Sequence, residues 1–156
     1  MNRTLGPVPT WAKITTFLLS LIGLGLATYL TITHFDPQAL YCTSTGVVDC
    51  AAVTTSAQSR LLGIPVAFLG LGTYLVMTAL NSPWGWRAKN YWLHVARFGI
   101  AIVSMCFVLW LLYAELIIID HICLYCTGVH VITFALLIVL TIVSPAQLGW
   151  VRSRTE

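Results

Sequence analysis

Charged residues are scarce in this chain. Only 8% of its 156 residues are Asp, Glu, Lys or Arg, and 58% are apolar, whereas soluble domains carry about 25% charged residues. A chain this poor in charge could not cover the surface of a water-soluble domain. Four stretches contain no charged residue at all: 14–33, 61–80, 98–114 and 122–143. Each is close to the ~20 residues that a helix needs to cross a hydrocarbon core of about 30 Å.

These stretches predict an all-α integral membrane protein, a four-helix transmembrane bundle with spans at about 12–33, 63–81, 94–119 and 122–143. The only long connection, 34–62, is expected to cap the bundle as a loop with a half-helix, and 51–60 could form a short amphipathic helix. Spans and connections use nearly the whole chain, so we expect a single transmembrane domain, 1–156. The first apolar stretch is longer than the 7–15 residues of a signal-peptide core, so we interpret it as a retained span.

Basic residues are few and unevenly distributed. Only Arg60 lies in the 34–62 connection, and the other seven cations precede span one, lie around the connection between spans two and three, or follow span four: Arg3, Lys13, Arg87, Lys89, Arg97, Arg152 and Arg154. The positive-inside rule then predicts cytoplasmic termini and an extracytoplasmic 34–62 connection. Because the cations are scattered rather than gathered in one patch, we expect no nucleic-acid partner.

The cysteines are the residues most able to carry out chemistry in this chain. Cys42 and Cys50 lie in the outer connection, and Cys123 and Cys126 form a Cys-x-x-Cys at the expected start of span four. Residues three apart on a helix share a face, so these two sulfurs are within disulfide reach. The partial positive charge of a helix N-terminus favours a thiolate there. Cys106 falls within span three, where a buried thiol is usually a small apolar filler.

Three interpretations of the two pairs remain open. Two dithiols beside a membrane suggest a relay in which a soluble partner's thiols reduce the outer pair, the outer pair reduces the inner pair, and a lipid-soluble quinone accepts the electrons. A flavin acceptor would need a glycine-rich phosphate-binding motif, which the sequence lacks. Alternatively, Cys42 and Cys50 could form a static disulfide in a structural or adhesion protein. A zinc site is the third interpretation, and the seven-residue gap between them suits it poorly.

The sequence resembles the vitamin K epoxide reductase family, in particular its bacterial members. The resemblance rests on four spans, a Cys-x7-Cys pair in the first outer connection, a Cys-x-x-Cys opening the last span, the stretch GIPVAFLG at 63–70, and Ser56 after the outer pair. It implies a quinone-dependent protein-thiol oxidoreductase of the bacterial inner (plasma) membrane. The implied quinone is of the ubiquinone, menaquinone or phylloquinone type, and no metal is implied. Many bacterial relatives carry a fused thioredoxin-like domain. This sequence shows none, so a separate thioredoxin-fold protein is expected as partner.

The resemblance also implies roles for individual residues. Cys42 would meet the partner, Cys50 would exchange with Cys123, and Cys126 would face the quinone, making all four catalytic. His130 lies four residues after Cys126 and shares its helix face, so it could hydrogen-bond a quinone carbonyl. Further candidate quinone contacts are Ser56, Pro65, Val66, Phe68, Trp110 and Tyr113.

Two further observations qualify the resemblance. The stretch 65–70 aligns with the family's quinone-contacting segment of span two but lacks its asparagine, which favours a simple quinone over an epoxide as acceptor. Glu115, Asp120 and His121, near the outer end of span three, could relay protons, although such positions more often hold solvated interfacial residues.

Overall fold

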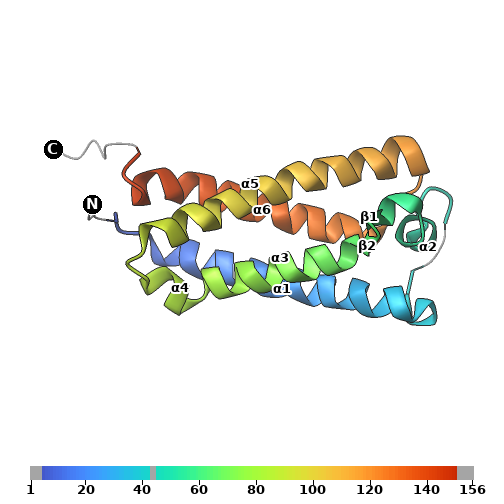
Figure 1. Cartoon of the computed structure of the whole chain (residues 1–156), viewed down its shortest axis with the longest axis horizontal. Coiled ribbons are helices and arrows are strands. Elements are labelled where there is room, and N and C mark those ends of the chain that lie inside the picture. Colours follow the sequence, from blue (N-terminus) through green and yellow to red (C-terminus); the bar gives the residue numbers. More distant parts are fainter. Residues whose placement is uncertain (1–4, 43–44, 151–156) are drawn as a thin grey trace.

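The computed structural model describes residues 5–42 and 45–150. Arg3, Arg152 and Arg154, which entered the orientation argument, lie outside the described residues. Four long helices run side by side along the long axis of the molecule (Figure 1): α1 (Thr10–Phe35), α3 (Val66–Asn81), α5 (Tyr91–Tyr113) and α6 (Leu124–Gln147). Helix α1 packs against α3 and α6, and α5 packs against α6 and α3, so the four close into a ring. The predicted all-α membrane bundle is confirmed.

Short elements cover the two ends of the bundle. At the end where both termini lie, α4 (Pro83–Arg87) joins α3 to α5 (Figure 1). The opposite end carries a cap made of the described residues between α1 and α3, 36–42 and 45–65. Its elements are the 3₁₀ turns η1 (Pro37–Ala39) and η2 (Ala57–Ser59), the helix α2 (Cys50–Thr54), and a hairpin of β1 (Arg60–Leu61) and β2 (Ile64–Pro65).

The cap helix is shorter than the one expected over 51–60. Helix α2 starts on Asp49, whose side chain accepts a hydrogen bond from the Ala52 backbone N–H at 3.0 Å. It stops after Thr54, because Thr54, Thr55 and Ser56 turn their hydroxyls back onto carbonyl oxygens of the same helix. Such side-chain bonds compete with continued helix formation.

Among the described residues, three helices are long and apolar enough to cross a membrane: Thr10–Phe35, Tyr91–Ile119 and Leu124–Gln147. The second of these is α5 continued by the π-helical turn η3 (Ala114–Ile119). Helix α3 has only 16 residues, a length of about 24 Å. It begins later than the expected 63–81 span, because Ile64 and Pro65 pair with β1 and Pro65 precedes the first helical residue.

Close helix packing depends on a glycine. A Cβ atom on Gly23 of α1 would stand 2.0 Å from Cε1 of Tyr74 on α3, so only glycine fits under that ring. The Tyr74 hydroxyl lies 2.9 Å from the Thr133 hydroxyl and 3.2 Å from the Val129 carbonyl oxygen, both on α6. One aromatic side chain therefore links three helices at the centre of the bundle.

A buried polar cluster joins the helices at the end where the termini lie. Arg97 is 1% exposed, stacks 3.6 Å from the centre of the Trp86 ring, and donates to the Leu80 carbonyl. Its guanidinium also lies 3.0 Å from Nδ1 of His94, which a Gln147 amide N–H approaches at 3.2 Å. Because both groups can only donate, Nδ1 of His94 accepts and Nε2 carries the proton. Arg97, counted above among the cations of a connection, therefore lies inside the bundle.

Candidate active site

The inner cysteine pair opens α6. Cys123 is the N-cap residue, and its sulfur accepts a hydrogen bond from the Cys126 backbone N–H at 3.3 Å. Both are free thiols, and Cys123 is fully buried. The sequence folds in this way because a cysteine sulfur here satisfies one of the N–H groups that every helix start leaves unpaired.

The outer pair is joined. Cys42 and Cys50 form a disulfide, with their Cα atoms 6.0 Å apart. Cys42 is half-buried in the cap, whereas Cys50 is 1% exposed and forms the first residue of α2. In this state two of the four sulfurs are unavailable as zinc ligands. Among the described residues no group of three or more His, Cys, Asp or Glu is placed to hold a metal ion.

Backbone hydrogen bonds hold the two pairs side by side. Val48 forms an isolated parallel bridge with Ile122. The Asp49 N–H donates to the Ile122 carbonyl at 3.2 Å, and the Ile122 N–H donates to the Val47 carbonyl at 2.9 Å. Cys50 and Cys123 each follow one of these bonded residues directly.

The same two cysteines share a small hydrophobic cluster. Cys50, Cys123 and Val53 are its buried members, and Cys42 and Cys126 pack against them. Sulfurs that are distant in the sequence are therefore brought together around a buried Cys50 and Cys123.

Two tyrosines hold the segment before Cys42. Tyr125, between the inner cysteines, donates its hydroxyl to the Tyr41 carbonyl at 2.7 Å. Tyr29 on α1 donates to the Ala39 carbonyl at 3.0 Å and accepts from the Tyr41 N–H at 2.9 Å. The two tyrosine rings pack with their centres 4.7 Å apart. The helix carrying the inner pair thus also positions the outer pair.

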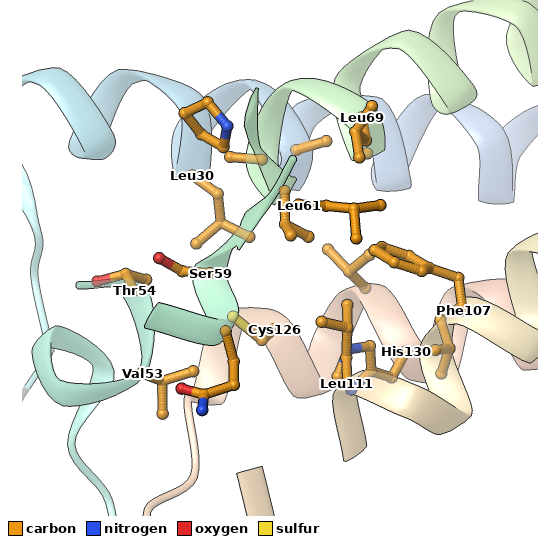
Figure 2. Close-up of a pocket in the computed structure, with 18 of the residues that line it drawn as sticks. Leu30, Val53, Thr54, Ser59, Leu61, Leu69, Phe107, Leu111, Cys126 and His130 are labelled. Carbon is orange, nitrogen blue, oxygen red and sulfur yellow. The ribbon is translucent and has the colours of Figure 1, made fainter. Parts of the chain in front are cut away.

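A cavity of about 320 Å³ opens beside the inner pair, between the four long helices and the cap. Its walls are mostly apolar. Cys126 and His130 face it from α6, Phe107 and Leu111 from α5, and Leu30, Leu61 and Leu69 from the other side (Figure 2). The volume and character match those of small-molecule sites.

The Cys123 thiol lies just before α6, outside the membrane-spanning helix. A hydrogen bond from the Cys126 thiol lowers the pKa of Cys123, and backbone N–H groups of Cys126 and Tyr125 act in the same direction. Burial and the charge of Glu115 oppose them without reversing the shift. Cys123 therefore ionises more readily than an ordinary cysteine thiol.

The family model of the vitamin K epoxide reductase family matches residues 14–141, a range that includes all four paired cysteines. The chain belongs to the vitamin K epoxide reductase family. Membership makes it a membrane oxidoreductase acting on thiols and disulfides, and the two cysteine pairs beside a cavity agree with that chemistry.

The cavity contains some of the quinone contacts predicted from the family resemblance and omits others. Ser56, Pro65, Val66 and His130 line it. Phe68 lies outside the lining and packs its ring 5.6 Å from that of Phe35. The lining also omits Trp110 and Tyr113, which are each about half exposed and pack against one another.

His130 is buried at 5% exposure, and its Nδ1 atom has no hydrogen-bond partner in the part of the chain that the structure describes. A buried polar atom without a partner is costly unless a ligand or water satisfies it. Because His130 lines the cavity, this atom fits a ligand that carries a hydrogen-bonding group, such as the carbonyl oxygen of a quinone.

Sequence reasoning underestimated Glu115. Instead of lying solvated at the interface, it is 4% exposed and lines the cavity together with Cys126. The sequence alone does not mark this burial, because only the structure shows that Ala101 and Val108, on the same helix face, are buried. Asp120, by contrast, is exposed. It is the C-cap residue of η3, and its backbone has the left-handed conformation with φ of 55°.

Proposed function

We propose that this protein relays electrons from the thiols of a separate thioredoxin-fold protein, through its two cysteine pairs, to a quinone in the membrane. The oxidised partner would then introduce disulfide bonds into other proteins. The observation that carries the proposal is the order of the four sulfurs. Cys42 is half-buried in the cap, Cys50 and Cys123 share a buried cluster, and Cys126 lines the cavity.

The first exchange involves the outer pair. A thiolate of the partner attacks the Cys42 sulfur, and Cys50 leaves as a thiolate. The partner's second thiol then resolves the mixed disulfide. Two electrons have moved, so the partner carries a disulfide and the outer pair carries two thiols.

The second exchange joins the two pairs. When Cys123 and Cys126 are oxidised, the Cys50 thiolate attacks Cys123 and Cys126 leaves as a thiolate. Cys42 then attacks Cys50, which re-forms the outer disulfide and leaves two thiols in the inner pair. The backbone bonds between residues 47–49 and Ile122 support this step, because they place Cys50 beside Cys123 through groups that take no part in the sulfur chemistry.

A quinone supplies the electron sink, since it accepts two electrons and two protons. The cavity suits its ring, and His130 offers an unpartnered Nδ1 to orient it. Ser56, Pro65 and Val66 would contact it, as the resemblance implies. The inner thiols lose their protons and close into a disulfide. A ubiquinone, menaquinone or phylloquinone-type acceptor would serve.

We further propose that the protein lies in a bacterial inner (plasma) membrane, with cytoplasmic termini and extracytoplasmic cysteine pairs. Lys13, Arg87 and Lys89 belong to the end of the bundle that holds the termini, and Arg60 belongs to the cap (Figure 1). This distribution follows the positive-inside rule. Labelling of Cys42 in intact cells by a membrane-impermeant maleimide, after mild reduction, tests the orientation.

The test of the relay is anaerobic quinone reduction by the purified protein, with a reduced thioredoxin-fold dithiol as donor. We expect wild type to reduce quinone and both Cys123→Ala and Cys126→Ala to abolish the reaction. Cys42→Ala should block the protein donor while dithiothreitol still supports turnover. No quinone reduction with any thiol, together with a Cys42–Cys50 bond that resists strong reductant, would instead favour a static disulfide.

A further inference from the structure

Glu115 is a buried carboxyl group for which the electron relay gives no role. It continues the buried stripe of α5, seven residues after Val108 and fourteen after Ala101. It also stands in the first turn of η3, where the helix widens to π geometry. Such turns are rare and often occur at functional sites. The Glu115 carbonyl accepts the backbone N–H groups of Asp120 and His121, which end the helix just before the inner pair.

The side chain of Glu115 lies where the inner pair meets the cavity. It lines the cavity together with Cys126, interacts with the Cys126 thiol, and its charge also acts on Cys123. The other titratable side chains lining the cavity are His34 on α1, Tyr74 on α3, and Cys126 and His130 on α6. Tyr74 is already bonded to α6. An ionisable group kept inside a membrane bundle calls for a functional explanation.

We propose that Glu115 is a catalytic residue that carries the thiol protons of the inner pair to the quinone. This inference rests on the proposed function. Oxidation of Cys123 and Cys126 breaks two S–H bonds and forms one S–S bond, and the quinone becomes a hydroquinone by gaining two electrons and two protons.

Protons move one at a time through the carboxyl group. The Cys126 proton passes to the Glu115 carboxylate and from there to a quinone oxygen, which regenerates the carboxylate. Once Cys126 has given up its own proton, its sulfur takes the Cys123 proton and passes it to Glu115, from which it reaches the second quinone oxygen. No further oxidant or base is needed, and Glu115 ends in the protonation state in which it began.

The experiment compares Glu115→Gln, which keeps the shape but cannot carry a proton, with Glu115→Asp and the control Asp120→Asn. Asp120 is exposed and left-handed, a conformation that asparagine tolerates. In single-turnover quinone reduction by dithiothreitol-reduced protein, we expect Glu115→Gln to be slower by about tenfold or more. Glu115→Asp should recover part of the rate, and Asp120→Asn should match wild type.

A second arm without quinone measures alkylation of Cys123 by iodoacetamide against pH, with Cys123 resolved from Cys126 by fragment masses. Because the Glu115 charge raises the pKa of Cys123, Glu115→Gln should move the profile to lower pH by about half a unit or more. The thiol thus becomes more reactive while quinone reduction becomes slower. Disruption of the fold would not produce this pair of opposite effects at unchanged thermal stability.

Each outcome decides something. Wild-type quinone reduction in Glu115→Gln, or an unmoved alkylation profile, overturns the role of Glu115. A rate loss that parallels a loss of thermal stability or of quinone affinity also overturns it in favour of a structural role. If wild type reduces no quinone, the proposed function fails. The alkylation arm then still decides whether Glu115 governs protonation of the inner pair, and an unmoved profile would overturn that too.

Discussion

Substituting Gly23 by alanine tests the packing that shapes the cavity. The added methyl carbon would lie 2.0 Å from Cε1 of Tyr74, a side chain only 4% exposed. Overpacking of this kind costs about 1–3 kcal/mol. Displacing the ring also strains its hydroxyl contacts with Thr133 and Val129, at about 0.5–1.5 kcal/mol. The better helix propensity of alanine returns about 0.5–1 kcal/mol, so we expect a net loss of about 2 kcal/mol in the free energy of unfolding.

Gly25 provides the matched control on the same helix. A Cβ atom there meets nothing within 4 Å. Gly25→Ala should therefore gain only the better helix propensity of alanine and stabilise the protein slightly. Unfolding in mixed micelles titrated with sodium dodecyl sulfate measures the change in unfolding free energy for both variants. In a Tyr74→Leu background the cost of Gly23→Ala should fall sharply, because the ring that it meets is gone. Equal effects of Gly23→Ala and Gly25→Ala, or an undiminished cost in that background, would refute the packing argument.

Three further changes probe the site. Cys126→Ala removes the hydrogen bond that most lowers the pKa of Cys123, so iodoacetamide should label Cys123 more slowly at pH 7 and the pH profile should move upward; a downward shift would contradict this. His130→Leu should weaken quinone binding about 2–10-fold, measured by equilibrium dialysis, whereas unchanged affinity would remove His130 from the quinone site. Tyr125→Phe loses the 2.7 Å bond to the Tyr41 carbonyl and should lower unfolding stability by about 0.5–1.5 kcal/mol. An unchanged midpoint in the same micelle titration would show that this bond contributes nothing.

The bundle follows from the sequence because length and apolarity alone decide whether a stretch can span a bilayer. The four long charge-free stretches fall mainly on the four long helices, and the start of 61–80 falls on the hairpin that precedes α3. The hairpin itself was not predictable. Its turn is made by Leu62 and Gly63, with φ of 52° and 84°, and leucine rarely adopts that conformation. No local pattern therefore marked the shortened start of α3.

Side-chain direction on α5 explains which proposed quinone contacts the cavity excludes. Val108 and Leu111 line the cavity. Trp110 and Tyr113 come two residues after them, about 200° around the helix, and therefore point away. Glu115 comes seven residues after Val108, about 20° from the same direction, and therefore points in. Because they are aromatic, Trp110 and Tyr113 were expected to line the quinone pocket. Their positions around the helix instead turn them away from the cavity and turn Glu115 toward it.

Contacts between the cap and α6 lie beyond sequence reasoning for a different reason. The bridge between Val48 and Ile122 joins single residues 74 positions apart, with no repeating pattern to mark the partners. It nevertheless creates an asymmetry that a relay requires. Cys50 adjoins a residue fixed by backbone bonds to α6, whereas the segment before Cys42 is held through the hydroxyl groups of Tyr29 and Tyr125. In the proposed relay, we therefore expect reduction of the disulfide to leave Cys50 beside the inner pair and Cys42 as the sulfur freer to meet a partner protein.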